Sequence, residues 1–267
     1  MSAPGVTEPD RPDGTAAGVA GGAPVDCQTS GAVARLTLAR PAVLNAIDQQ
    51  VCQALVRHIE RLEQDGETRV IVVSGQGRAF SAGADLRLMR SLDAQALRRF
   101  IELTWWAFDR LRRSPLVSIA ALHGHVLGGG LELALACDLR IADDTASLAL
   151  PEMGLGSVPG SGAMQRLPAL IGESRTLELA LSGRRVQADE ALRIGLVNLA
   201  VPAGQAQDQA MQWAASFAGR PAEAVRYAKT AMRARGDPEL AAALHGLISA
   251  CCQKNKAYQG NTERFQA

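Results

Sequence analysis

The sequence predicts an α/β fold followed by a helical C-terminal region. Residues 33–38 alternate apolar and polar side chains as a half-buried strand does, and residues 70–73 form a short apolar run between polar neighbours. Between them, residues 49–62 carry apolar side chains near helical spacing. A strand, a helix and a strand in this order favour parallel pairing. Beyond Pro159 the pattern is almost wholly helical.

The same pattern continues along the chain with variations. Residues 94–111 predict a helix, residues 116–122 a buried strand, and residues 131–137 a helix that follows three glycines. Short strands are expected at residues 139–142 and 147–150. The helices expected downstream cover residues 162–171, 175–181, 188–194, 205–218, 221–235 and 238–256. The sequence has no repeat of about 20 to 50 residues, which excludes solenoids and propellers.

The length of the chain, 267 residues, suits one large domain with an appendage, since a typical domain has about 150 residues. Residues 1–23 are rich in Ala, Gly, Pro, Thr and Asp and have almost no large apolar side chain, so we expect a disordered N-terminal tail. We assign residues 24–200 to the α/β core and residues 201–267 to the helical C-terminal region.

Composition and charge indicate a globular protein that is neither exported nor bound to a polyanion. Apolar residues make up 47% of the chain, and 28 Lys and Arg face 27 Asp and Glu, so we expect no nucleic-acid partner. The most apolar stretch, residues 116–139, contains Glu132 and three glycines, so we expect no membrane span. Five cysteines without a CxxC pair favour a reducing, cytoplasmic location and no metal module.

Two glycine-bearing turns each follow an apolar strand and precede a helix. The first covers residues 75–86 and contains Gly83, and the second covers residues 124–133 and contains Gly128 and Gly129. Glycine admits close backbone approach and unusual φ, and a helix start leaves N–H groups without partners. Two such donors converging on one oxygen would form an oxyanion hole. Glycine turns also serve purely structural roles, so spacing alone leaves both interpretations open.

The sequence does not match the motifs of several other kinds of site that use glycine, serine, histidine or lysine. A dinucleotide fingerprint needs a third glycine where the chain has Phe80. A serine nucleophile elbow at Ser81 lacks its first glycine, because Ala79 occupies that position. His123 and His125 have no third metal ligand placed by spacing, so we expect no metal. A Walker loop needs a Gly-Lys pair, and the lysines of the chain are Lys229, Lys254 and Lys256.

Glu132 and Glu152 are the candidate acid/base groups. Glu132 falls in the first turn of the helix after three glycines, in an apolar segment where an unpaired carboxylate is costly to bury. Glu152 follows Pro151 at the end of an expected strand. Each has a structural alternative, because Glu132 would favour the positive end of a helix and Glu152 could be a surface acid. Two carboxylates in apolar surroundings beside N–H donors nevertheless suggest paired acid/base work.

Six segments of the chain form a distinctive series. They are residues 40–47 (RPAVLNAI), 77–86 (GRAFSAGADL), 123–133 (HGHVLGGGLEL), 136–142 (ACDLRIA), 151–162 (PEMGLGSVPGSG) and 195–198 (GLVN). Together and in this order they resemble the crotonase family of enoyl-CoA hydratases and isomerases, over most of the chain from about Val33 to Ala257. One departure is Ala163, which stands where many members have a further glycine. The resemblance implies a crotonase-like spiral of repeated β-β-α units with a helical C-terminal region.

The resemblance also implies chemistry on acyl thioesters of coenzyme A. The thioester oxygen would be held by the backbone N–H groups of Ala84 and Gly129. Members that hydrate enoyl-CoA carry two glutamates, which match Glu132 and Glu152, 20 residues apart. The pair would activate water for addition at the β-carbon, and Glu152 would supply the proton to the α-carbon. Enoyl-CoA hydration is therefore the expected reaction; isomerisation, decarboxylation, thioester hydrolysis and a silent binding or scaffold role are the alternatives.

Further expectations follow from the same resemblance. Coenzyme A enters as part of the substrate, with no separate cofactor and no metal. With few lysines, contacts to its phosphates would fall to arginines or backbone near residues 42–46 and 82–86. Trp105 and Trp106 either shape the acyl pocket or pack in the core. The C-terminal helices would form a homotrimer or hexamer and cover the site. The residues expected to bind acyl-CoA are Val43, Ala82, Asp85, Leu86, Gly128 and Pro151.

Overall fold

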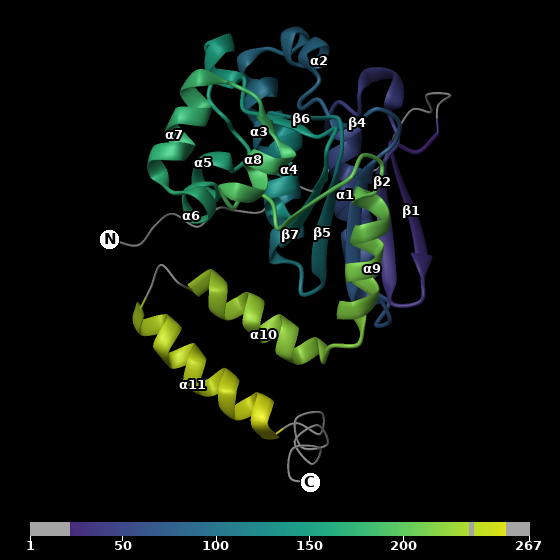
Figure 1. Cartoon of the computed structure of the whole chain (residues 1–267), viewed down its shortest axis with the longest axis vertical. Helices are drawn as coiled ribbons and strands as arrows, with labels where there is room; N and C mark the ends of the chain where they lie inside the picture. The colour runs from purple at the N-terminus through teal and green to yellow at the C-terminus, as the bar shows by residue number, and fades with distance from the viewer. Residues whose placement is uncertain (1–21, 235–237, 255–267) are drawn as a thin grey trace.

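A computed structural model describes residues 22–234 and 238–254. Within these ranges a larger sheet has six strands in the order β1-β2-β3-β5-β7-β10 and a smaller sheet has four in the order β4-β6-β8-β9 (Figure 1). The strands of the larger sheet are β1 (Val25–Ser30), β2 (Val33–Leu38), β3 (Val70–Gly75), β5 (Val117–Leu122), β7 (Leu139–Asp143) and β10 (Leu199–Val201). Those of the smaller sheet are β4 (Ala79–Ser81), β6 (His125–Leu127), β8 (Ser147–Ala149) and β9 (Val186–Gln187).

Helices surround both sheets. The α-helices are α1 (Gln49–Gln64), α2 (Leu86–Ser91), α3 (Ala94–Arg113), α4 (Gly129–Ala136), α5 (Ala163–Arg166), α6 (Pro168–Ile171), α7 (Glu173–Ser182), α8 (Ala188–Arg193), α9 (Ala206–Ala218), α10 (Ala222–Arg233) and α11 (Pro238–Lys254). Two 3₁₀ turns are η1 (Pro41–Val43) and η2 (Glu152–Leu155). The predicted α/β fold with a helical C-terminal region is confirmed.

A β-β-helix unit repeats along the chain. In successive units the first strand, β3, β5 or β7, joins the larger sheet and the second strand, β4, β6 or β8, joins the smaller one. Neighbouring first strands pair in parallel, and so do neighbouring second strands. The turns that leave β4 and β6 therefore lie next to each other, because the carboxyl ends of parallel strands meet at one edge.

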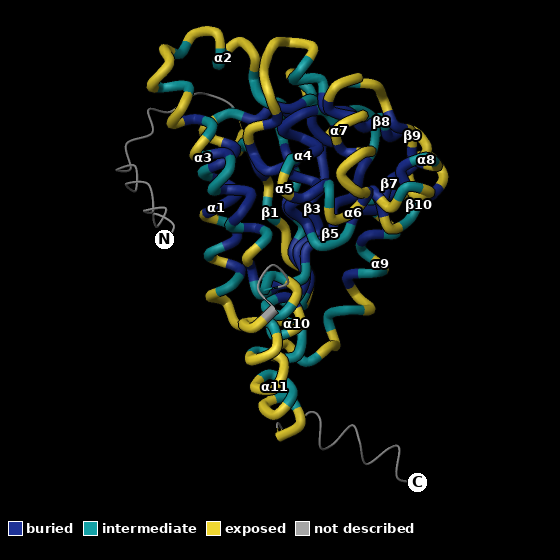
Figure 2. The backbone as a smooth tube through the Cα atoms, turned by 90° about the vertical axis from the view of Figure 1, so that its left-hand side faces the viewer, coloured by how far each residue is buried: buried dark blue, intermediate teal, exposed yellow. Residues whose placement is uncertain are grey.

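The larger sheet is covered on both faces, which explains its continuous apolar strands. Along β3, Ile71 and Val73 belong to the main core with α1, α3 and α4. Val70 and Val72 point to the opposite face and belong to a second cluster with α9. This alternation is the two-residue period of a strand. Figure 2 shows the resulting buried centre of the molecule, with α10 and α11 largely outside it.

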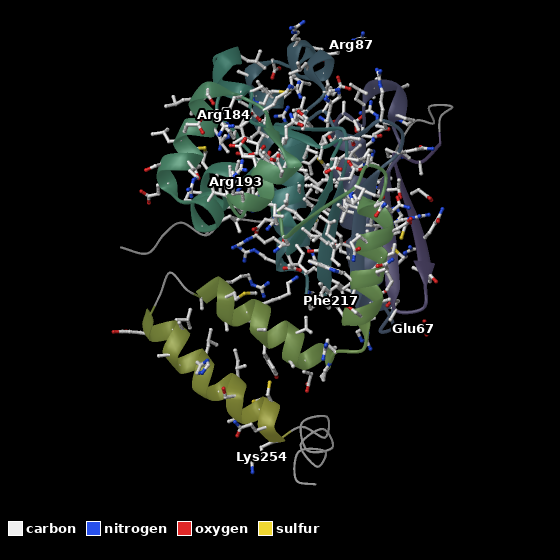
Figure 3. The ribbon with its side chains drawn as sticks, in the orientation of Figure 1. Glu67, Arg87, Arg184, Arg193, Phe217 and Lys254 are labelled. Atoms are coloured by element: carbon white, nitrogen blue, oxygen red, sulfur yellow. The ribbon has the colours of Figure 1, made fainter. Side chains whose placement is uncertain are left out.

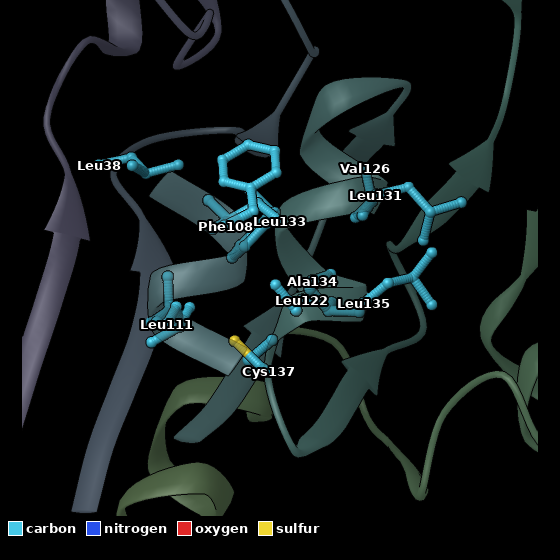
Figure 4. Packing of buried hydrophobic residues seen from close by; sticks show 14 of the residues in the cluster. Leu38, Phe108, Leu111, Leu122, Val126, Leu131, Leu133, Ala134, Leu135 and Cys137 are labelled. Carbon is cyan, nitrogen blue, oxygen red and sulfur yellow. The ribbon is translucent and has the colours of Figure 1, made fainter. Parts of the chain in front are cut away.

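The helix that follows β6 is buried on all sides. Its sequence indicates this, because apart from Glu132 it consists of glycine, leucine and alanine and has no polar face. Every residue of α4 is buried, including Glu132. Figure 4 shows Phe108 of α3 beside Leu133 of α4, and Leu122 of β5 beside Ala134, all members of the main core. The segment around α4 is therefore a rigid support for any group on its first turn.

The C-terminal helices α10 and α11 pack against each other and extend away from the α/β body (Figure 1). One buried side chain, Lys229 of α10, joins them to that body. Its Nζ donates hydrogen bonds to the Leu116 carbonyl and to Oδ2 of Asp138, both at 2.6 Å. The Ser118 N–H and hydroxyl donate to the same Asp138 oxygen at 2.8 and 2.9 Å. The carboxylate of Asp138 thus anchors α10, and Arg233 adds longer hydrogen bonds to the Arg112 and Arg113 carbonyls at 3.4 and 3.5 Å.

Several elements differ from the sequence-based expectation. The strands β1, β9 and β10 were not expected; β9 and β10 are too short to show a period, and β1 is an edge strand with mostly polar residues. The helix expected at 162–171 is two helices, α5 and α6, because Pro168 at the start of α6 cannot donate a helical hydrogen bond. The predicted N-terminal tail, residues 1–23, lies outside the described residues apart from Gly22 and Ala23.

In the described ranges, no helix has both the length and the apolar character needed to cross a membrane.

Replacing Lys229 by Met should lower the free energy of unfolding by about 3 kcal/mol, because the Asp138 carboxylate loses its cation. Urea denaturation at one fixed protein concentration measures the change. Arg226→Met is the control, since Arg226 is an exposed cation on the same helix, and it should change stability by less than about 0.5 kcal/mol. Equal stabilities of the two variants would contradict the assignment of Lys229 as the anchor.

Candidate active site

A cavity of about 400 Å³ opens beside the turns that follow β4 and β6. Residues from both turns, from α2 and α3, and from the segment between β8 and α5 line it. The lining residues are Ile47, Ala82, Gly83, Ala84, Leu86, Met89, Arg90, Phe100, Ile101, Thr104, Gly128, Gly129, Glu132, Pro151, Glu152, Leu155, Ser157, Val158, Gly160 and Ser161. Most of these side chains are apolar, and Glu132 and Glu152 are the carboxylates among them.

The two glycine turns approach each other at backbone distance. Gly83 has φ of +96°, and a Cβ atom there would lie 2.7 Å from the Leu127 carbonyl oxygen. A Cβ atom on Gly129 would lie 3.4 Å from the backbone nitrogen of Ala84. Only glycine accepts both the positive φ and the close contact at position 83. The turns therefore bring the nitrogens of Ala84 and Gly129 to the same wall of the cavity.

The N–H groups of Ala84 and Gly129 donate no hydrogen bond to any described residue. Around Ala84, the adjoining peptide groups are paired with Ile47: the Ile47 N–H donates to the Gly83 carbonyl and the Asp85 N–H to the Ile47 carbonyl, both at 2.8 Å. Gly129 begins α4, where first-turn N–H groups have no helical acceptor. Two unpaired donors facing one cavity are suited to an oxygen that carries negative charge.

Glu132 is held in one orientation by backbone donors. It lies in the first turn of α4 and is 3% exposed. Its Oε1 accepts hydrogen bonds from the Ser161 N–H at 2.7 Å and the Ala163 N–H at 3.1 Å. Burial raises the pKa of Glu132 above its usual value, and the two backbone hydrogen bonds oppose that rise.

Glu152 is the less constrained of the two carboxylates. It begins η2 directly after Pro151, and its Oε2 is buried without a hydrogen-bond partner in the part of the chain that the structure describes. Burial, and to a smaller extent the charge of Glu132, raises the pKa of Glu152 to about 7. A Cβ atom on Gly128 would lie 2.7 Å from its Oε1, so a larger residue at position 128 would displace the carboxylate.

Most of the residues expected to bind acyl-CoA line the cavity, namely Ala82, Leu86, Gly128 and Pro151. Val43 does not; it is 41% exposed in η1. Asp85 does not line it either. Its carboxylate instead caps α2 by accepting hydrogen bonds from the Arg87 and Leu88 N–H groups at 3.1 and 3.3 Å.

The expectation for the two tryptophans requires a correction. Neither Trp105 nor Trp106 is among the residues that line the cavity. Helix α3 instead presents Phe100, Ile101 and Thr104, which precede the tryptophans, and Trp106 packs against the main core. Both tryptophans lie C-terminal to the stretch of α3 that faces the cavity, and Trp106 is a core residue.

Sequence reasoning missed the backbone donors at Ser161 and Ala163. The signal was present, because a buried glutamate at position 132 required partners and the glycine-rich segment 159–162 could supply N–H groups. It also missed Met89 and Leu155 as lining residues, since their places depend on how α2 and η2 fold over the cavity.

The C-terminal helices add nothing to the cavity lining in a single chain. Figure 3 shows Arg87, next to the cavity-lining part of α2, and Lys254, at the end of α11, at opposite ends of the molecule. Site cover and oligomerisation by this region stay predictions. Across residues 22–234 and 238–254, no cluster of three or more His, Cys, Asp or Glu is arranged to hold a metal ion.

The sequence matches a family model described as enoyl-CoA hydratase/isomerase over residues 28–260. The chain belongs to this enoyl-CoA hydratase/isomerase family. It is 36% identical over 206 residues to the short-chain-enoyl-CoA hydratase of Clostridium acetobutylicum, covering 77% of this chain and 79% of that protein.

Solved structures of the enoyl-CoA hydratase/isomerase family agree with the fold. A Geobacillus kaustophilus enoyl-CoA hydratase superposes with a TM-score of 0.86 at 35% identity, over 91% of this chain and 95% of that one. A Thermobifida fusca protein in complex with acetoacetyl-CoA superposes with a TM-score of 0.79 at 32% identity, over 86% and 94% of the two chains. The architecture is therefore the crotonase fold.

The carboxyl of Glu152 should titrate near pH 7, and Glu132→Gln should lower that value because the variant removes a neighbouring negative charge. Carbon-detected NMR of labelled glutamate carboxyls measures both values. A titration of Glu152 near its ordinary 4.5 would contradict the burial argument.

The raised pKa of Glu152 makes the stability of the protein depend on pH. Between pH 4.5 and about 7 the folded protein keeps a proton on Glu152 that the unfolded chain has lost. The stabilising contribution of this group is therefore complete below pH 4.5 and disappears as pH rises through 7. Glu152→Gln should flatten the pH dependence of the unfolding free energy in this window.

Proposed function

We propose that the protein is an enoyl-CoA hydratase that adds water across the 2,3 double bond of a trans-2-enoyl-CoA and gives a 3-hydroxyacyl-CoA. The observation that carries the proposal is the placement of the buried Glu132, the half-buried Glu152 and two unpaired backbone N–H groups around one largely apolar cavity. The family membership and the named hydratases among its relatives support it.

The N–H groups of Ala84 and Gly129 would bind the thioester carbonyl oxygen. Addition of water at the β-carbon pushes electrons into the thioester, so negative charge develops on that oxygen as the enolate forms. Fixed donors in a largely apolar cavity stabilise this charge more than they stabilise the neutral thioester. This difference lowers the barrier to addition.

The two glutamates would divide the proton transfers. Glu132, with Oε1 fixed by two N–H groups, presents its other oxygen to the attacking water. Glu152, whose pKa of about 7 keeps it partly protonated near neutral pH, gives its proton to the α-carbon. The oxygen of water bonds to the β-carbon, and the proton that water loses returns to the carboxylate pair, so the enzyme ends unchanged.

Coenzyme A would bind as part of the substrate and no separate cofactor is proposed. The acetoacetyl-CoA complex of the Thermobifida fusca relative supports binding of a thioester of this kind. Arg90 lines the cavity and Arg87 is an exposed cation on the same helix, so both are available to the phosphates. We also propose a cytoplasmic location and a homotrimer or hexamer. The exposed apolar side chains of Leu177, Leu181 and Leu247 support an assembly of subunits.

Isomerisation of a 3-enoyl-CoA is the second candidate. It needs one carboxyl that removes a proton at C2 and returns one at C4, and Glu152 has an unpaired oxygen and a pKa of about 7. The fixed orientation of Glu132 favours hydration, because an isomerase has no use for a second carboxylate aimed at water.

Loss of the conjugated enoyl-thioester absorbance with crotonyl-CoA tests the proposal. Glu132→Gln and Glu152→Gln should each lower turnover by roughly 10²–10⁴-fold, because each removes a proton-transfer group. Mass spectrometry should identify the 3-hydroxyacyl product, and a longer trans-2-enoyl-CoA gives a first measure of acyl preference.

The control for these variants is Glu173→Gln, an exposed glutamate at the start of α7 outside the cavity lining, which should retain full turnover. Unchanged turnover in both cavity variants would overturn the assignment of the glutamate pair. Conversion of a 3-enoyl-CoA without hydration would favour the isomerase.

A further inference from the structure

The turn that holds Glu132 is itself held by a buried arginine. Arg166 of α5 is 8% exposed, and its Nη1 donates a hydrogen bond to the Ser161 carbonyl at 2.7 Å. Between Ser161 and Ala163, Gly162 has φ of +110°, and a Cβ atom there would lie 2.1 Å from the same Nη1. The guanidinium therefore packs directly on the turn whose N–H groups bind Glu132.

Arg166 is fixed on its other side by α3. Its Nη2 lies 3.8 Å from Oδ1 of Asp109, a buried carboxylate that also accepts a hydrogen bond from Arg113. Asp109 thus links the guanidinium to a long core helix. A continuous series of contacts runs from α3 through Arg166 and the turn at Ser161 to the carboxylate of Glu132.

Arg166 does not line the cavity, so it is not placed to contact a substrate bound there. Burial raises the pKa of Glu132, and the positive charge of Arg166 lowers it. The other charged groups that act on this pair are Glu152 beside Glu132, and Asp109 and Arg112 beside Arg166. Loss of Arg166 would remove both a support of the turn and a cation that lowers the pKa of Glu132.

We propose that Arg166 is a positioning residue that fixes the orientation and charge of Glu132 through the turn at Ser161 and Gly162. The inference rests on the proposed hydratase function for its kinetic consequences but not for its structural ones. A merely structural Arg166 would support the fold without acting on Glu132.

Arg166→Gln should lower kcat of crotonyl-CoA hydration roughly 10- to 100-fold with KM within about twofold, because the variant misplaces a group that acts on water and not one that binds coenzyme A. Arg166→Lys should recover part of the loss, since it keeps the charge but has no planar fork. Arg110→Gln is the matched control. It removes another ion pair of α3, to Glu63, away from the turn, and should leave kcat unchanged.

A double-variant cycle separates positioning from general destabilisation. In a Glu132→Gln background, Arg166→Gln should cost less than about twofold further in kcat, because the group that it positions is already absent. An equal loss in both backgrounds, or a loss matched by Arg110→Gln, would overturn the proposal.

A titration that needs no turnover tests the positioning role of Arg166 independently of the hydratase assignment. Carboxyl NMR of labelled Glu132 should show its pKa rise by about one unit in Arg166→Gln and stay unchanged in Arg110→Gln. An unmoved Glu132 titration would overturn the proposal. If the wild-type protein hydrates no enoyl-CoA while the titration moves as expected, the proposed function fails and the positioning role stands.

Discussion

The close approach of two backbone turns, one after β4 and one after β6, sets the positions of two unpaired N–H groups and of Glu132 in the cavity. The parallel pairing of these strands brings their carboxyl ends together, and Gly83 lets the first turn pass within van der Waals distance of the Leu127 carbonyl. Because the flanking peptide groups of Ala84 are paired with Ile47, and because Gly129 begins a helix, one N–H from each turn is left without an acceptor. The same helix start carries Glu132, and Gly128 leaves room for Glu152.

The two carboxylates line one cavity but have different surroundings, and this difference supports the separate roles that we propose for them. Glu132 is bound through one oxygen by two N–H groups, and Arg166 acts on it from behind the turn that supplies them. Glu152 has a buried oxygen without a described partner, and its pKa is raised to about 7. The proposed addition of water to a double bond requires a base that acts on water and a proton donor near neutrality, and these surroundings suit Glu132 and Glu152 to the two tasks.

Much of this arrangement was predictable from local sequence, because it depends on strand period, helix starts and glycine. The parallel core, the two turns and both glutamates all have such local signatures. What local pattern could not supply was the distance between segments far apart in the chain. Trp105 and Trp106 looked like pocket residues by position, yet the stretch of α3 facing the cavity is Phe100 to Thr104. The hydrogen bonds of Ser161 and Ala163 to Glu132, and the packing of Arg166 on Gly162, likewise arise only from tertiary folding.

In the proposed reaction the N–H groups of Ala84 and Gly129 polarise the bound thioester. Difference infrared spectroscopy of crotonyl-CoA carrying ¹³C at the thioester carbonyl, bound to Glu152→Gln so that turnover is slow, tests it most directly. We expect a carbonyl stretch at lower frequency than in water, and loss of that shift when Gly129→Pro removes one donor. A bound thioester whose carbonyl frequency equals that in water would show that these N–H groups do not polarise it.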